Sequence, residues 1–508
     1  MPNSVSRIGS DGLQCCRIRE SLNQFDMKRL HCILTLNLTT ACLAFIGTSP
    51  ANAELRFGAA TADITPDQPV ALSGQRHLRI SKKPETPISA TALALESRKG
   101  NEVLDQAVIV SCDLVAIREG ILEKVREKVK PRLPDFDVKK LFLSATHTHT
   151  APVTLEGRYA IPKTGVMTPT EYVDFMTSRI ADAVVKSWTN RKPGKLSWGQ
   201  GQAVIAQNRR AVYANGTAVM YGRTNNEKFR GQEGTEDHNL EVLFFWDADD
   251  KLLATAINVA CPAQEVEGGS SLNADFWHPV RETLRERFGK DLHILGWAGA
   301  GGDQSPHLMI GKAADERMRK LSGLTRLEEL ARRIVNGWTE AYEAAHKDKH
   351  TDAVLHHISH PIKLPYRKVT DVELADAKMQ VEKYAKNPAQ RWNYLWHQSV
   401  VTRHEIQQTE GVGTFEMELH LLRLGDIAIA SNEFELFTDY GFQMKARSPA
   451  VQTFVIQLTG SAGYLPSERA VNGGGYSAII QSSRIGPKGG QSLVEQTVSG
   501  MKSLWAKP

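Results

Sequence analysis

The sequence predicts an α/β fold, a multilayer sandwich of mixed β-sheets flanked by helices, within a single large domain. Residues 105–117 form a continuous apolar run rich in valine and isoleucine, which is typical of a buried strand. An amphipathic helix pattern over 118–133 and a second strand-like run over 137–146 follow, an order that favours neighbouring parallel strands. Residues 240–260 and 414–433 each have the pattern of two strands around a polar turn, so we expect mixed sheets.

The N-terminal 53 residues differ from the rest of the chain. Lys28 and Arg29 precede an apolar stretch, and Ala51–Ala53 has the small-residue form of a cleavage site. This pattern is typical of a secretory signal peptide. We therefore predict an exported protein, periplasmic or secreted, that consists of a leader (1–53, with the signal peptide over 27–53) and one domain (54–508).

Composition excludes several classes of protein. The chain has 508 residues, of which 41% are hydrophobic and 23% charged, and this balance is typical of a soluble globular protein. The net charge of +5 comes without a concentrated block of Lys and Arg, so we predict no nucleic-acid partner. Four of the six cysteines lie in the leader, and the remaining Cys112 and Cys261 are too few for a disulfide framework. Peripheral contact with a membrane and the oligomeric state stay open.

Two histidines, His147 and His149, follow the strand-like run in the stretch LFLSATHTHTAP (141–152). Residues i and i+2 of a strand point to the same face, so we expect both imidazoles to project together where α/β folds place their ligand clefts. Imidazole is a common zinc ligand, and the pair could supply part of a metal site. The alternative is a pair of partly buried histidines bonded to the backbone.

Other polar side chains lie next to predicted strands or helix starts. In GAGGDQSPH (299–307), Asp303 and Ser305 follow an apolar strand, either facing a cleft or capping a tight turn. Asp275 and His278 are three residues apart and can share a helix face, although Asp275 is also a typical N-cap.

The C-terminal part of the chain contributes acidic and phenolic candidates. Glu433 and Glu435 follow a predicted strand, and Tyr464 and Tyr476 lie in glycine-rich segments typical of loops.

Taken in order, these segments resemble the catalytic N-terminal domain of the neutral, non-lysosomal ceramidase family. RFGAATADITP is similar to the family's first strand and turn, and SATHTHTAP to its T-H-T-H-S-G-P motif. AQNRRAVY resembles its N-R-S segment, GGDQSPH its G-D-V-S-P-N motif, and YLPSERAVNGGGY keeps a tyrosine pair around a short polar segment. The resemblance extends from Arg56 to Ser477.

Members of this family are zinc amidases that hydrolyse the N-acyl bond of ceramide, and the resemblance implies the same chemistry here. Zinc lowers the pKa of a bound water towards ~7 and polarises the amide carbonyl. The implied zinc ligands are His147, Glu433 and Tyr464. The implied catalytic residues are His149 for proton transfer, Arg209 as the carbonyl or oxyanion partner, Tyr476 as a second tyrosine, and Ser305 with Asp303 from the amidase motif.

The chain departs from the family at the second zinc histidine. NVACPAQEVEG (258–268) occupies that region and contains no histidine, so Gln264, Glu265 or His278 is the expected replacement. The sequence therefore predicts a divergent zinc amidohydrolase that acts on a ceramide-like lipid. Two alternatives stay open: a non-catalytic relative that binds a lipid or glycan, and a metallohydrolase with another amide or ester substrate.

Overall fold

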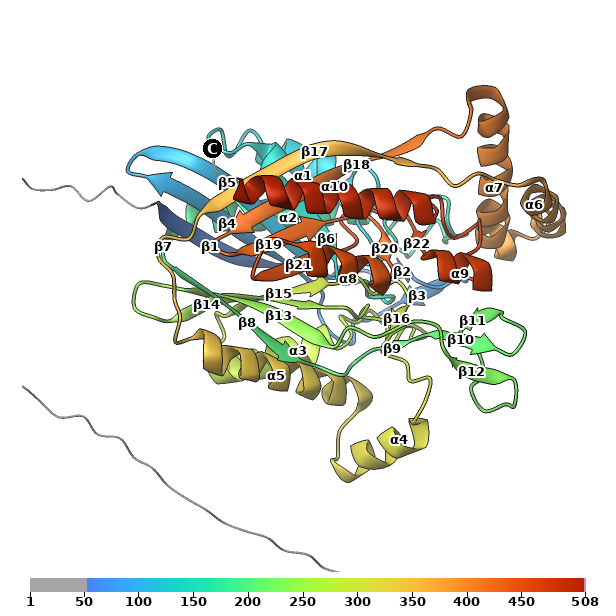
Figure 1. The fold of residues 1–508 in the computed structure, drawn as a ribbon, viewed down its shortest axis with the longest axis horizontal. Coiled ribbons are helices and arrows are strands. Elements are labelled where there is room, and N and C mark those ends of the chain that lie inside the picture. Colours follow the sequence, from blue (N-terminus) through green and yellow to red (C-terminus); the bar gives the residue numbers. More distant parts are fainter. Residues whose placement is uncertain (1–52, 507–508) are drawn as a thin grey trace, which may run out of the picture. The chain divides into compact units, whose positions relative to one another are not determined.

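The structure is a computed structural model that describes residues 53–506. Three β-sheets meet around a common apolar centre, and helices cover each sheet on its other face (Figure 1). The predicted sandwich of mixed sheets flanked by helices is confirmed. The predicted leader lies outside the described residues except for its last residue, Ala53.

The first sheet has the strand order β6-β5-β4-β1-β7, and helices α1 and α2 pack on it. Strands β5 and β6 are parallel and are connected through α1, as the sequence predicts, while the other pairs are antiparallel. The elements are β1 (Glu54–Asp63), β4 (Ser89–Lys99), β5 (Glu102–Cys112), β6 (Leu141–Ala145), β7 (Lys192–Pro193), α1 (Ile121–Val129) and α2 (Pro169–Thr189).

The second sheet has the order β15-β14-β13-β8 and carries α3 and α5, and the third has the order β17-β18-β19-β21 and carries α8 and α10. Each contains one parallel pair, β14 with β15 and β19 with β21. Their elements are β8 (Lys195–Gln202), β13 (Asn239–Trp246), β14 (Leu252–Val259), β15 (His293–Ala298), α3 (Trp277–Phe288), α5 (Arg326–Ala345), β17 (Leu355–Pro365), β18 (Thr414–Leu424), β19 (Ile427–Ser431), β21 (Gln452–Ile456), α8 (Thr438–Arg447) and α10 (Pro487–Trp505).

Smaller elements surround the ends of these sheets. No helix within 53–506 is both long and apolar enough to cross a membrane. The smaller elements are β2 (Val70–Leu72), β3 (Arg79–Ser81), β9 (Gln207–Asn208), β10 (Arg210–Tyr213), β11 (Ala218–Met220), β12 (Phe229–Gln232), β16 (Gln304–Ser305), β20 (Glu435–Leu436), β22 (Tyr464–Leu465), α4 (Lys312–Leu321), α6 (Asp371–Tyr384), α7 (Arg391–Glu410), α9 (Glu468–Gly473) and the short 3₁₀ helices Val138–Lys140 and Pro388–Gln390.

The side chains of each strand point alternately to the two faces of its sheet, and both faces are buried. In β4, Leu93 and Leu95 point into the common centre, while Ala92 and Ala94 point towards the helices. Side chains alternate between the two faces of a strand, so large residues fill the space between sheets and small ones admit a close-packed helix. Burial on both faces accounts for the continuous apolar runs in the sequence.

The carboxyl ends of the parallel pairs in the three large sheets lead into the same region. The segment after β6 binds the segments after β14 and β21, through Ala263 N–H to Thr146 O (3.1 Å) and Ala145 N–H to Leu458 O (3.2 Å). Gln457 N–H in turn donates to Ala298 O at the end of β15 (3.0 Å). Loops at the carboxyl edge of parallel strands are the usual place for a ligand cleft in α/β proteins.

Candidate active site

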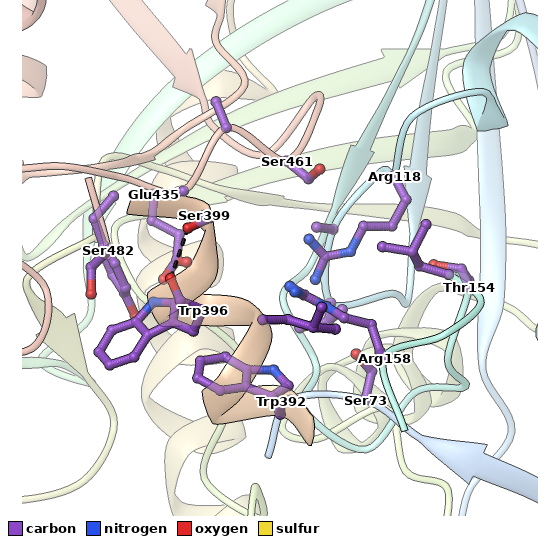
Figure 2. A pocket seen from close by; sticks show the side chains of 18 of the residues that line it. Ser73, Arg118, Thr154, Arg158, Trp392, Trp396, Ser399, Glu435, Ser461 and Ser482 are labelled. Carbon is purple, nitrogen blue, oxygen red and sulfur yellow. Dashed lines mark hydrogen bonds between the residues drawn. The ribbon is translucent and has the colours of Figure 1, made fainter. Parts of the chain in front are cut away.

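A cavity of about 350 Å³ opens where these loops meet. His147, His149, Glu435 and Tyr464 line it, and helix α7 closes one side with Trp392 and other residues (Figure 2). The cavity therefore contains residues from segments that are more than three hundred positions apart in the chain.

His147 and His149 converge, although not as neighbours on a strand. Strand β6 ends at Ala145, and His147 has a left-handed backbone with φ of 67°. Its N–H donates to Leu114 O (3.0 Å), which fixes this turn. The turn brings the Nε2 atoms of the two rings to 3.1 Å from each other.

The partners of the two Nδ1 atoms determine which ring nitrogens carry hydrogen. Nδ1 of His147 lies 2.6 Å from Val115 O, and because a carbonyl oxygen only accepts, this nitrogen is the donor. Nδ1 of His149 lies 3.0 Å from Oε2 of Glu267. Burial would raise the pKa of Glu267, but hydrogen bonds from His149 and His307 outweigh it and hold that pKa well below its usual range. In the neutral rings, both Nε2 atoms therefore present lone pairs to each other.

The carboxylate beside His147 belongs to Glu435. Its Oε2 lies 3.5 Å from Nε2 of His147 and 3.9 Å from a guanidinium nitrogen of Arg209. Burial would raise the pKa of Glu435, but His147, Arg209 and a hydrogen bond with Tyr464 lower it to about 2. Glu435 pairs with Tyr464 across the parallel strands β20 and β22, which brings both side chains to the site.

The choice of Glu433 as the metal-binding carboxylate is corrected by this geometry. The backbone bends between the end of β19 and Glu435, so the two glutamates have different neighbours. Glu433 packs against Gly460 and is absent from the cavity lining. Burial and the nearby charges of Glu123 and Glu418 raise its pKa to about 7.

Arg209 connects the carboxylate to the tyrosines. It is 2% exposed and donates to the Tyr464 hydroxyl (3.1 Å) and to Gly302 O (2.8 Å). The ring of Tyr476 meets that of Tyr464 edge to face, with centroids 5.7 Å apart, and lines the same cavity. Burial raises the pKa of Tyr464 well above its usual value, so its hydroxyl keeps its proton.

Ser305 and Gln264 lie together on the other side of the histidine pair, and Asp303 lies beneath. The Gln264 amide donates to the Tyr221 hydroxyl (2.6 Å), which is 3.0 Å from Oγ of Ser305. Asp303 accepts hydrogen bonds from Thr438 N–H (3.0 Å) and Oγ1 (2.7 Å), and it is buried. Asp303 therefore stabilises its loop through hydrogen bonds and does not line the cavity.

His278 does not reach the histidine pair. It lies in the first turn of α3, where the charges that act on it come from Glu282, Arg281, Asp113 and Arg285, and it does not line the cavity. Burial lowers its pKa. The position of His278 near a helix start, three residues after Asp275, therefore does not bring its imidazole to the site.

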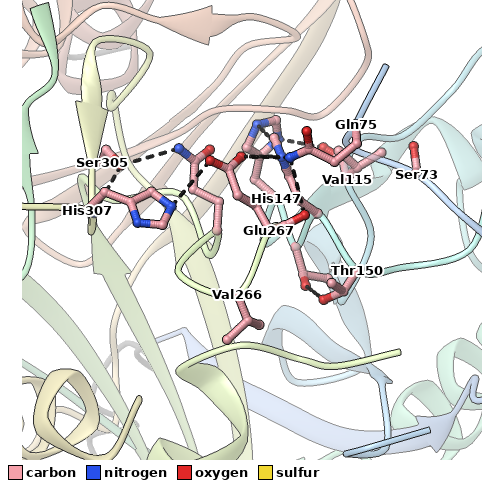
Figure 3. A network of polar contacts seen from close by, with 12 residues as sticks. Ser73, Gln75, Val115, His147, Thr150, Val266, Glu267, Ser305 and His307 are labelled. Carbon is pink, nitrogen blue, oxygen red and sulfur yellow. Dashed lines mark hydrogen bonds and ion pairs between the residues drawn. The ribbon is translucent and has the colours of Figure 1, made fainter. Parts of the chain in front are cut away.

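Sequence reasoning missed two residues that extend the site, Glu267 and Tyr221. Glu267 joins His149 to His307, whose Nε2 lies 3.2 Å from Oε1, and this network runs towards Ser305 (Figure 3). Glu267 also lines a second cavity of about 690 Å³, together with Tyr221 and His307. Glu267 lies within the quoted segment 258–268, but only the folded loop shows that its carboxylate turns towards His149.

The donors around His147 fit the chemistry of zinc. Nε2 of His147 lies at the cavity, 3.1 Å from Nε2 of His149, and an imidazole nitrogen is a common zinc donor. Glu435 and the phenol of Tyr464 add oxygen donors beside them. Within residues 53–506, however, no group of three or more His, Cys, Asp or Glu side chains is arranged so that it could hold a metal ion. The zinc site therefore stays a prediction.

The two histidines follow the parallel strand β6, and Glu435 and Tyr464 come from the parallel pair β20 and β22. The chain is therefore an α/β protein with a polar site at its strand ends. Within this class, the chain has the ceramidase fold. It superposes on neutral ceramidase from Pseudomonas aeruginosa with a TM-score of 0.65 and 16% identity, over 89% of this chain and 75% of that chain. A ceramidase complexed with C2 gives 0.63 and 13%, over 89% and 76%. No protein-family model and no curated protein sequence matches the chain. The resemblance predicted from the motifs is confirmed for the fold.

Proposed function

We propose that the protein is an exported zinc-dependent hydrolase that uses water to cleave an N-acyl amide bond of a ceramide-like lipid. The observation that carries this proposal is the pair of facing Nε2 atoms of His147 and His149 beside the ionised Glu435. The two ceramidases that share the fold, one of them complexed with C2, support the class of substrate. Export rests on the leader pattern over 27–53.

His147, Glu435 and Tyr464 would hold the zinc, with His149 beside it. When bound, zinc polarises an amide carbonyl and makes hydroxide available near neutral pH. Amides are poor electrophiles, so this assistance suits the reaction.

The remaining residues have roles that follow from their contacts. Arg209 carries a positive charge 3.1 Å from the Tyr464 hydroxyl, so the two together can stabilise negative charge that develops on the amide oxygen. His149 is held by Glu267 with its Nε2 towards the site, which places a proton-transfer group near the leaving amine. Tyr476 packs on Tyr464 and fixes its ring.

The test is metal analysis of the purified mature protein combined with a panel of N-acyl amides. We expect one zinc per chain, amide hydrolysis, and loss of both in His147→Asn with the fold retained. Asn tolerates the left-handed backbone at this position. Protein that binds no stoichiometric metal under any loading condition, while remaining folded, contradicts the proposal.

One observation favours a second candidate, a relative that binds a lipid or glycan without turnover or acts on another amide or ester. The segment 258–268 supplies no histidine, and the Gln264 amide is engaged with Tyr221 instead. A protein with fewer zinc ligands binds metal more weakly. Ligand binding without zinc and without turnover would identify the non-catalytic relative, whereas turnover of esters alone would identify another substrate.

A further inference from the structure

The cavity that leads to His147 is lined by arginines from separate parts of the chain. Arg118 follows β5, Arg158 lies in the loop before α2, and Arg484 precedes α10. Arg403 joins them from α7, where its guanidinium donates to the carbonyls of Ile480 (2.9 Å) and Arg367 (3.3 Å). Four guanidinium groups around one cavity are unusual for a site that takes an uncharged lipid.

No carboxylate within residues 53–506 forms an ion pair with these four arginines. Among the same residues, the guanidinium groups of Arg118 and Arg158 have no hydrogen-bond partner, and Arg158 lies over the Trp392 ring. The acidic residues of the lining are Glu119 and Glu435, and Glu435 already faces His147 and Arg209.

Mutual repulsion among the arginines is visible in their titration. Burial, together with the charges of Arg158 and Arg484, lowers the pKa of Arg118 to about 10, against the opposing charge of Glu435. The pKa of Arg158 is lowered by burial, and Arg484 acts in the same direction. Like charges brought together without counter-ions make the free cavity a place where an anion is favoured.

Aromatic side chains line the cavity beside these arginines. Trp392 and Trp396 project from α7, and the Arg158 guanidinium lies 5.7 Å from the centroid of the Trp392 ring (Figure 2). Arg76 lies over both indoles, at 4.6 and 4.3 Å from the ring centroids, which holds them in place. The indoles therefore offer apolar surface to an acyl chain, and the neighbouring guanidinium groups suit an oxyanion, for which the planar guanidinium is the best-matched side chain.

We propose that the substrate is an anionic N-acyl amide, whose carboxylate, sulfonate or phosphate group binds to Arg118 and Arg158 while its acyl chain lies against Trp392 and Trp396. This inference rests on the proposed function for the reaction and adds the charge of the substrate. It distinguishes the preferred substrate from uncharged ceramide.

The experiment compares substrates that share a dodecanoyl chain and differ in charge. N-dodecanoylglycine, N-dodecanoyltaurine and O-phosphorylated N-dodecanoylethanolamine are anionic, while N-dodecanoylglycinamide and N-dodecanoylethanolamine are neutral. A charge-assisted hydrogen bond is worth about 1.5–3 kcal/mol, so we expect kcat/KM for at least one anion to exceed that of the neutral compounds by about tenfold or more. The anion with the largest ratio identifies which oxyanion the site takes.

Arg118→Gln and Arg158→Gln are expected to abolish this preference mainly through KM, and Arg317→Gln, an exposed charge on α4, is the control that should leave it intact. The thermal midpoint of Arg118→Gln should stay level or rise, because repulsion is relieved, whereas a purely structural arginine would lower it. Equal kcat/KM for neutral and anionic substrates, or a preference that survives both substitutions, overturns the inference while leaving the proposed function intact.

A binding measurement keeps the two proposals separable. If no amide of either kind is cleaved, the proposed function fails. Calorimetry with N-dodecanoylglycine and N-dodecanoylglycinamide then decides the inference, which requires that only the acid binds and that Arg118→Gln weakens it by about tenfold. If dodecanoate binds as tightly as N-dodecanoylglycine, the arginines hold the carboxylate of the released acid, and the inference is wrong.

Discussion

Two pairs of histidines touch each other in this protein, and their surroundings differ. His147 and His149 line the cavity at the strand ends, with Nε2 atoms 3.1 Å apart. His357 on β17 and His420 on β18 are buried against Phe142, with Nε2 of His357 3.0 Å from Nδ1 of His420. Distance alone does not separate the two pairs.

The surroundings of the nitrogens do separate them. In the core pair, Nδ1 of His357 donates to Gln106 O (3.1 Å) and Nε2 of His420 lies 2.7 Å from Glu418, so in the neutral rings Nε2 of His357 and Nδ1 of His420 also face each other with lone pairs. Both of these rings are buried and pack against Phe142. In the cavity pair, the facing Nε2 atoms lie at the cavity wall, and Glu435 lies 3.5 Å from Nε2 of His147. Facing lone pairs favour a proton or cation beside them, and at the cavity such a partner can enter and meets a carboxylate.

The largest effect is expected from His147→Asn. We predict that amide hydrolysis falls by about 1,000-fold or more, because the zinc ligand and one of the two facing nitrogens are lost together. The free energy of unfolding should change little, since His147 contacts the cavity and not the core. Activity and zinc content of wild type and variant give the measurement. His420→Ala is the matched control and should retain activity per folded molecule. Loss of activity in His420→Ala, with activity retained in His147→Asn, would contradict the comparison.

The two glutamates beside β19 provide the next test. Glu435→Gln keeps the shape but removes the charge beside His147 and Arg209, so we expect kcat to fall by about 100-fold. Glu433→Gln changes the same residue type two positions away, outside the cavity, and should leave kcat within about twofold. Steady-state kinetics of both variants measures the difference. Equal losses of kcat in the two variants would mean that the position of Glu435 beside the histidines does not determine its role.

The fold was predictable because strand and helix patterns are local. The apolar run at 105–117, the hairpin-like segments and the alternation of large and small residues in β4 follow from side-chain periodicity. The convergence of His147, Arg209 and Tyr464 was predicted through the order of motifs, since no local signal connects residues so far apart in the chain.

The other features of the site depend on turns and on long-range packing, which local sequence patterns do not show. Glu433 and Glu435 are equivalent by sequence, and only the bend after β19 decides which one enters the cavity. Arg118 and Arg158 lie in loops without a motif, and their significance comes from meeting each other without a carboxylate. His278 shares a helix start with Asp275, yet α3 points it towards Glu282 and Arg281.

A smaller effect, on stability, is expected from His420→Ala. The substitution removes a buried ring together with its hydrogen bonds to His357 and Glu418, so we predict a loss of about 2–4 kcal/mol in the free energy of unfolding. Urea unfolding followed by circular dichroism measures it. His356→Ala, the exposed neighbour on β17, should stay within about 0.5 kcal/mol of wild type. A stability loss in His147→Asn as large as in His420→Ala would remove the distinction between the core pair and the cavity pair.

The last expected effect is on the pH dependence of stability and concerns Asp275, a buried carboxyl that forms no ion pair with a cationic side chain within residues 53–506. Its oxygens accept from Val266 N–H (2.9 Å) and Phe276 N–H (2.8 Å), and burial nevertheless raises its pKa to about 7. Because the folded-state pKa lies above that of the unfolded chain, the unfolded state loses its proton first, and stability declines as pH rises from about 4 to 7, by at most about 4 kcal/mol.

Asp275→Asn removes this titration and suits the left-handed backbone at that position (φ 55°). We therefore expect the variant to lose less stability than wild type between pH 5 and pH 8, whatever its absolute stability, as measured by urea midpoints at both pH values. Asp249→Asn, in an exposed turn, should follow the wild-type curve. Parallel curves for Asp275→Asn and wild type would mean that the two backbone N–H groups stabilise the charged carboxylate as fully as a cation does, and would contradict the predicted titration of Asp275.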